Sequence, residues 1–155
     1  MRPRAAAIAL AGILTLAACG SSAPASHTAA APTVTPASQI IASAAASECS
    51  AFGAVYAQVQ ASIPAGTSPA ATVPVVQANA SSWNAGLEHA SKDDPPGVPI
   101  GGNAANDLAA SISKAAVDLG FARLDALTGK PAAYLTDLGK FLKDASRLSA
   151  TCRHY

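Results

Sequence analysis

Apolar residues recur at every third or fourth position in four separate segments, and this spacing limits the fold more than any other feature of the sequence. The four stripes occupy residues 41–63, 73–90, 108–126 and 134–152. Such a step places side chains on one face of a helix. No segment alternates apolar and polar residues over a strand length, and the hairpin dipeptides Asn-Gly and Asp-Gly are absent. The pattern therefore predicts an all-α domain with four helices.

Proline and glycine separate the four segments at the points where helices have to begin and end. Pro69 or Pro74 falls in the expected first turn of the second segment and Pro131 in that of the fourth, where the missing amide hydrogen costs no bond. Pro64 and Gly66 follow the first segment, and Gly129 follows the third. Because the connection between the third and fourth segments is so short, these two helices are expected to be antiparallel. We expect a four-helix up-down-up-down bundle over residues 36–155.

The third segment has the broadest apolar face. Its main stripe is widened by Val117, Phe121 and Leu124. This breadth predicts that the third helix is the most buried of the four. The main stripe consists of Leu108, Ile112, Ala115, Leu119, Ala122 and Ala126.

The first 18 residues have the composition of an export signal. Two arginines within residues 1–4 precede an apolar run over residues 5–17 and a small-residue cleavage site. This run is shorter than the roughly 20 residues that a membrane span requires. We expect no later apolar stretch of that length and therefore no permanent transmembrane helix.

The end of this leader reads Leu16-Ala17-Ala18-Cys19. It resembles the lipobox of bacterial lipoproteins, in which the cysteine thiol receives a diacylglycerol and becomes the first residue of the mature chain. The resemblance implies cleavage after residue 18, lipidation of Cys19, and attachment to the cell membrane on its extracytoplasmic side. The alternative is a plain signal peptide whose cleavage site lies beside a cysteine. The alanine-rich composition is also similar to that of envelope lipoproteins of actinobacteria.

Residues 19–35 follow as a segment of Ser, Thr, Ala and Pro without apolar periodicity. This composition cannot bury enough surface to offset the entropy of ordering, so it predicts a flexible tether. His27 lies within it and has no second ligand nearby, so we expect it to be solvated rather than bound to a metal.

Cys49 and Cys152 are the two cysteines that remain once Cys19 is assigned to lipid. In an exported protein an even pair predicts a disulfide. The alternative is a redox-active or metal-binding thiol pair, which the long separation and the absence of Cys-x-x-Cys disfavour.

The charge of the chain gives no indication of a nucleic-acid partner. The formal net charge is +1, from 10 basic and 9 acidic side chains. Loss of Arg2 and Arg4 with the leader leaves 8 basic and 9 acidic side chains. A clustered basic face, the usual footprint of nucleic-acid binding, is not present in the sequence.

Catalytic and cofactor motifs are absent from the sequence, which contains no Gly-x-Gly-x-x-Gly, His-Glu-x-x-His or Gly-x-Ser-x-Gly. No cofactor, metal or enzymatic activity is therefore expected.

Glu88, His89 and Asp93 form either a solvated helix end or an acid–base or metal site. The loop over residues 93–102 is a simple connection or a recognition loop, and His154 is expected in a frayed end.

Four aromatic residues are candidates for an apolar ligand pocket, with ordinary core packing as the alternative: Tyr56, Trp83, Phe121 and Phe141. The sequence is compatible with two functions. The first is a non-catalytic, lipid-anchored module that contacts an envelope protein or supports the envelope. The second is a carrier or sensor of a small apolar ligand bound between the helices.

Overall fold

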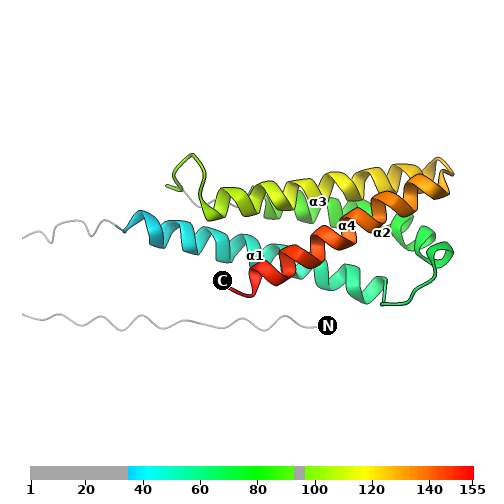
Figure 1. The fold of residues 1–155 in the computed structure, drawn as a ribbon, viewed down its shortest axis with the longest axis horizontal. Coiled ribbons are helices and arrows are strands. Elements are labelled where there is room, and N and C mark those ends of the chain that lie inside the picture. Colours follow the sequence, from blue (N-terminus) through cyan, green and yellow to red (C-terminus); the bar gives the residue numbers. More distant parts are fainter. Residues whose placement is uncertain (1–34, 93–96) are drawn as a thin grey trace, which may run out of the picture. The chain divides into compact units, whose positions relative to one another are not determined.

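The computed structural model describes residues 35–92 and 97–155, and within them it contains four helices and no strand (Figure 1). The all-α prediction is confirmed for these residues. The expected leader, the Cys19 lipidation site and the tether up to residue 34 lie outside the described residues. The helices are α1 (Ala37–Ser62), α2 (Pro69–Ala90), α3 (Ala104–Leu127) and α4 (Pro131–Cys152).

Residues that favour helix ends mark both ends of α3. The Asn103 side chain caps α3, because its Oδ1 accepts hydrogen bonds from the backbone N–H groups of Ala105 and Asn106, both at 3.1 Å. Gly129 ends α3 with a φ of 67°, and the next amide donates back to the Asp125 carbonyl at 3.0 Å. The chain thereby reverses within three residues and enters α4 at Pro131.

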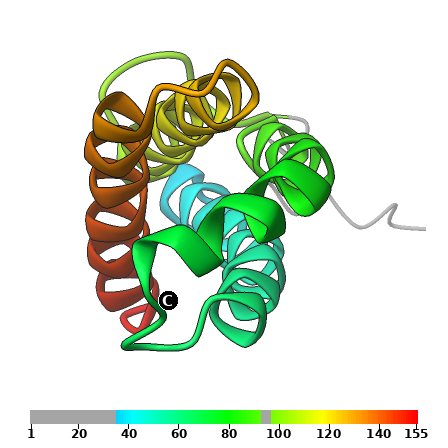
Figure 2. The same cartoon turned by 90° about the vertical axis from the view of Figure 1, so that its right-hand side faces the viewer.

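Helix α3 is the central element of the packing. It contacts α1, α2 and α4, and α1 packs against α3 more extensively than against α4. Figure 2 shows α4 along the left side and α3 at the upper edge, with α2 crossing in front of α1 from the lower left to the upper right. The sequence led us to expect the first and last helices as neighbours; they do contact each other, but α1 packs more extensively against α2 and α3 than against α4.

Small side chains allow the helices to approach closely. Ten of the 24 buried apolar residues are alanine. At Gly86 in α2 an added Cβ would lie 2.6 Å from Val55 Cγ2 in α1. The α1–α2 contact is therefore closer than even an alanine would permit at this position.

Polar bonds link the helices where the core includes polar groups. The Tyr134 hydroxyl in α4 donates to Thr72 Oγ1 in α2 at 2.7 Å, and burial raises the pKa of this tyrosine. The Gln77 side chain donates to the carbonyl of Ala126 near the end of α3 at 2.8 Å. Together these bonds fix α2 against both later helices.

Helix α3 has more buried residues than any other helix of the described residues, as its broad apolar face predicted, but that face is not buried over its whole width. The main stripe is buried, but Val117, Phe121 and Leu124 are 56%, 53% and 53% exposed. The reason is geometric, because all three neighbouring helices pack on the side of the main stripe and none covers the opposite side. The broad face consists of one buried stripe and one exposed stripe.

By its length and composition alone, α1 could cross a membrane. This differs from the expectation that no stretch after the leader is long and apolar enough to do so. Its only charged residue, Glu48, has no exposed surface, and its inner face also buries Phe52 and Val59. These contacts make α1 a core helix of the described structure.

Candidate functional site

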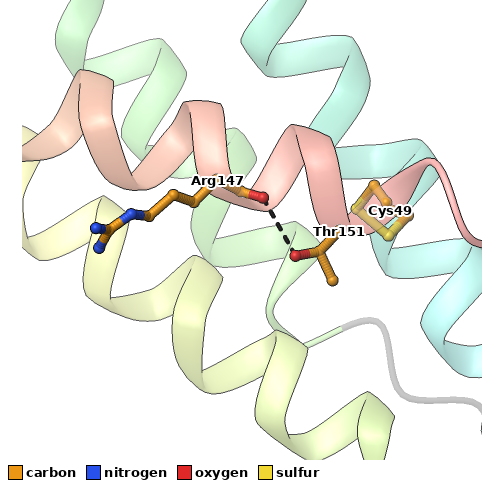
Figure 3. Close-up of a disulfide and its surroundings, with 4 residues drawn as sticks. Cys49, Arg147 and Thr151 are labelled. Carbon is orange, nitrogen blue, oxygen red and sulfur yellow. Dashed lines mark hydrogen bonds between the residues drawn. A yellow bond between two sulfur atoms is a disulfide. The ribbon is translucent and has the colours of Figure 1, made fainter.

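The predicted disulfide is present. Cys49 in α1 is bonded to Cys152 at the end of α4, with the two Cα atoms 5.3 Å apart and 103 positions apart in sequence (Figure 3). Beside it, the Thr151 hydroxyl donates to the carbonyl of Arg147 at 3.2 Å. Cys49 is buried and Cys152 half-buried. The bond links the C-terminal end of α4 to the middle of α1.

The four aromatic candidates occupy different environments. Trp83 and Phe141 are 2% and 1% exposed and belong to the core. Tyr56 is half-buried and stacks on Phe52, with ring centroids 5.6 Å apart. Phe121 lies on the uncovered side of α3. The structure therefore does not bring these four rings together around one pocket.

The polar residues considered at the end of α2 are solvated where the structure describes them. Glu88 is exposed and accepts a hydrogen bond from the Asn84 amide at 3.1 Å, and His89 is also exposed. Asp93 lies outside the described residues, as does His27, and His154 is exposed. Among residues 35–92 and 97–155, no group of three or more His, Cys, Asp or Glu could hold a metal ion.

The connection between α2 and α3 has one packed residue and one fully exposed one. Val98 packs against the core, whereas Ile100 is completely exposed. The backbone at Gly97 lies near Ile40 in the first turn of α1. Residues 93–96 of this connection lie outside the described residues.

A polar groove of about 360 Å³ runs between α3 and α4. The Lys114 ammonium donates hydrogen bonds to the carboxylates of Asp144 and, at 3.1 Å, Asp118. These bonds raise the pKa of Lys114, and the same contact lowers the pKa of Asp144. The lining residues are Ser111, Lys114, Asp144, Arg147, Leu148 and Thr151.

The charges of this polar groove largely compensate one another. Arg147, the second cation, lies 3.9 Å from Asp144, so both cations face carboxylates. The hydroxyls of Ser111 and Thr151 donate to backbone carbonyls of their own helices. The arrangement can stabilise the α3–α4 pair, and none of the groove's lining side chains is an activated nucleophile.

An apolar groove of about 290 Å³ lies at the other end of α4, against the α1–α2 connection. Gly139 stands in its wall, and a Cβ there would meet no atom within 4 Å. The apolar groove is lined mainly by Ile63, Pro64, Leu135, Leu138 and Leu142. Neither groove contains any of the four aromatic candidates.

The uncovered side of α3 forms a third feature, which we call the outer α3 face. It consists of Val117, Phe121, Leu124 and Leu127, each more than half exposed. The sequence contains a signal for this face, because its residues form a second stripe at helical spacing, but periodicity alone does not show that the stripe is uncovered. Comparison of the chain with protein-family models, with curated proteins and with solved structures finds no match.

Proposed function

We propose that this chain is a lipid-anchored protein on the outer side of the cytoplasmic membrane, where its helical domain acts as a non-catalytic interaction or envelope-structural module. The observation that carries the proposal is the sequence Leu16-Ala17-Ala18-Cys19 at the end of a positively charged and apolar leader. In this proposal residues 1–18 are the signal peptide and residues 19–35 form the tether.

The disulfide supports export and leaves one cysteine for lipid. Disulfides persist in oxidising compartments and are rare in the cytosol. Of the three cysteines in the chain, Cys49 and Cys152 are bonded to each other, so Cys19 is the one outside the pair. Two acyl chains on a single cysteine are sufficient for stable anchoring, whereas one chain would be marginal.

The proposed architecture is an up-down-up-down bundle closed by the disulfide. The short connections after α1 and α3 support this order, because each joins helices that contact one another. The ion pairs around the polar groove support a structural rather than catalytic use of that surface. An envelope protein is the expected macromolecular partner of such a module.

Lipid attachment can be tested by labelling cells with a radioactive fatty acid. The wild-type chain is expected to incorporate label that survives organic extraction, and Cys19→Ala is expected to lose all of it, because the thiol is the attachment point. The Cys49→Ala/Cys152→Ala variant, which retains Cys19, serves as the control and should stay labelled. Label on Cys19→Ala, or none on the wild type, would contradict the proposal.

A second candidate function, carriage of a small apolar ligand, is favoured by the apolar groove alone. Its volume of about 290 Å³ lies near the roughly 300 Å³ at the lower end of small-molecule sites. Leu138 forms part of its floor, and Gly139 leaves space in its wall. This location differs from the aromatic pocket that the sequence suggested.

Filling the apolar groove tests this second candidate. Gly139→Leu is expected to reduce the fluorescence of a groove-bound apolar dye, 1-anilinonaphthalene-8-sulfonate, by about fivefold or more, since the new side chain occupies the binding space. Gly53→Leu, on the exposed side of α1, is the matched control and should leave the signal unchanged. Equal dye binding by the wild type and both variants would remove the carrier hypothesis.

A further inference from the structure

Besides its buried stripe, the second half of α3 exposes a second set of apolar side chains to water. Its apolar residues Val117, Phe121 and Leu124 are exposed, together with Leu127. Over the same stretch the charged residues Asp118, Arg123 and Asp125 are only partly exposed. A helix that faced water would place the charged side chains outward and the apolar ones inward.

The outer α3 face is continuous and contains no charge. Its members follow one another at steps of three or four residues, so they lie on one side of the helix. In Figure 2, α3 lies at the upper edge of the helical unit, and no helix of the described residues is drawn above it. The face is a ridge on a single helix, which a fluid apolar surface can accept without a complementary shape.

The size of the face argues against a second copy of the chain as its partner. Four half-exposed side chains of this kind offer roughly 400 Å² of apolar surface, about half of the roughly 800 Å² that each partner contributes to a standard interface. A face of this size is too small for a stable dimer by itself. It is large enough to strengthen the membrane attachment of a chain that a lipid anchor already holds.

The expected tether between Cys19 and α1 is long enough to let the helical unit reach the membrane that holds the lipid. Seventeen residues, 20–36, separate the lipobox cysteine from the start of α1 at Ala37. A flexible segment of this length has a root-mean-square span of roughly 20–25 Å, and a fully extended one reaches roughly 60 Å. The 26-residue helix α1 is about 39 Å long. A lipid surface therefore stays within reach of every side of the helical unit, at a high effective concentration.

From the exposed apolar stripe, its small uncharged surface and the tether length we infer that the outer α3 face lies on the lipid bilayer, at the boundary between headgroups and acyl chains. This inference rests on the proposed lipid anchor. It makes the anchored domain lie along the membrane with α3 against the lipid, and it leaves the polar groove and the α1 surface available to other partners.

Tryptophan quenching in vesicles tests the inference on the complete lipidated protein. The protein is reconstituted into vesicles of phosphatidylcholine and phosphatidylglycerol whose acyl chains carry bromine. Phe121→Trp is expected to be quenched at least about twofold more than Gln58→Trp, because interfacial aromatic side chains enter the acyl-chain boundary. Gln58 is an exposed residue of α1, and the native Trp83 is buried and gives the same background in both variants.

Three outcomes separate the possibilities. Flotation with vesicles and stronger quenching of Phe121→Trp support the inference. Flotation with equal quenching of the two variants overturns the membrane face and leaves the anchor intact, and a concentration-dependent dimer mass in that case assigns the face to a second copy. Failure of the complete chain to float overturns both the anchor and the inference that rests on it. Circular dichroism of both variants establishes that each is folded.

Discussion

Replacing Cys49 and Cys152 together by alanine is expected to lower the free energy of unfolding by up to about 4.7 kcal/mol, the loss that the chain-entropy model gives for a loop of about 100 residues. The bond joins residues 103 positions apart, so it restricts most of the helical unit in the unfolded state. Apart from this bond, α4 contacts α1 only slightly and is held mainly by α3. Denaturant unfolding followed by circular dichroism measures the loss.

Reduction of the wild-type protein provides the control for this variant. The reduced protein should lose the same stability as the double variant, since both lack only the covalent link. Cys19→Ala should unfold like the wild type, because this cysteine lies outside the disulfide. A loss of less than about 1 kcal/mol would show that the α1–α4 tie contributes little, far below the expected entropic effect.

Gly86→Ala is the substitution with the next largest expected effect, a destabilisation of about 1–3 kcal/mol typical of an overpacked contact. The added methyl group would lie 2.6 Å from Val55 Cγ2, so α1 and α2 must separate or Val55 must change rotamer. This cost outweighs the roughly 1 kcal/mol by which alanine is the better helix former. Thermal or denaturant unfolding gives the difference directly.

Gly53→Ala is the matched control, since Gly53 is also in the interior of a helix but a Cβ there meets no atom within 4 Å. It is expected to stabilise the protein by about 0.5–1 kcal/mol through helix propensity alone. Combining Gly86→Ala with Val55→Ala should recover part of the loss, because the contacted methyl group is removed. Equal stabilisation by both glycine substitutions would contradict the close α1–α2 approach.

The helices could be predicted from the sequence because they depend on local signals. Pro69 and Pro131 occupy the first positions of α2 and α4, as their fixed φ angle favours, and Gly129 ends α3. The disulfide was also predictable, since Cys152 falls on the apolar stripe of its helix and Cys49 on that of the first. Neither inference required knowledge of how the helices are arranged.

The outer α3 face and the apolar groove depend on how the four helices pack against one another. Local sequence signals could therefore not predict them. Periodicity shows that Phe121 lies on an apolar stripe, but only the positions of the neighbouring helices decide whether that stripe is covered. The apolar groove joins Ile63 to Leu138, which are far apart in sequence. The burial of Glu48 could not be predicted from periodicity, because carboxylates are rarely fully buried, yet this side chain has no exposed surface.

The intact mass of the protein isolated from its native membrane tests the central claim most directly. The account predicts a chain that begins at Cys19, lacks residues 1–18, retains the Cys49–Cys152 disulfide and carries the additional mass of a diacylglyceryl group. Fragmentation should place this added mass on Cys19. A mature chain with no added mass, or one in which the added mass lies on another residue, would contradict the lipid anchor.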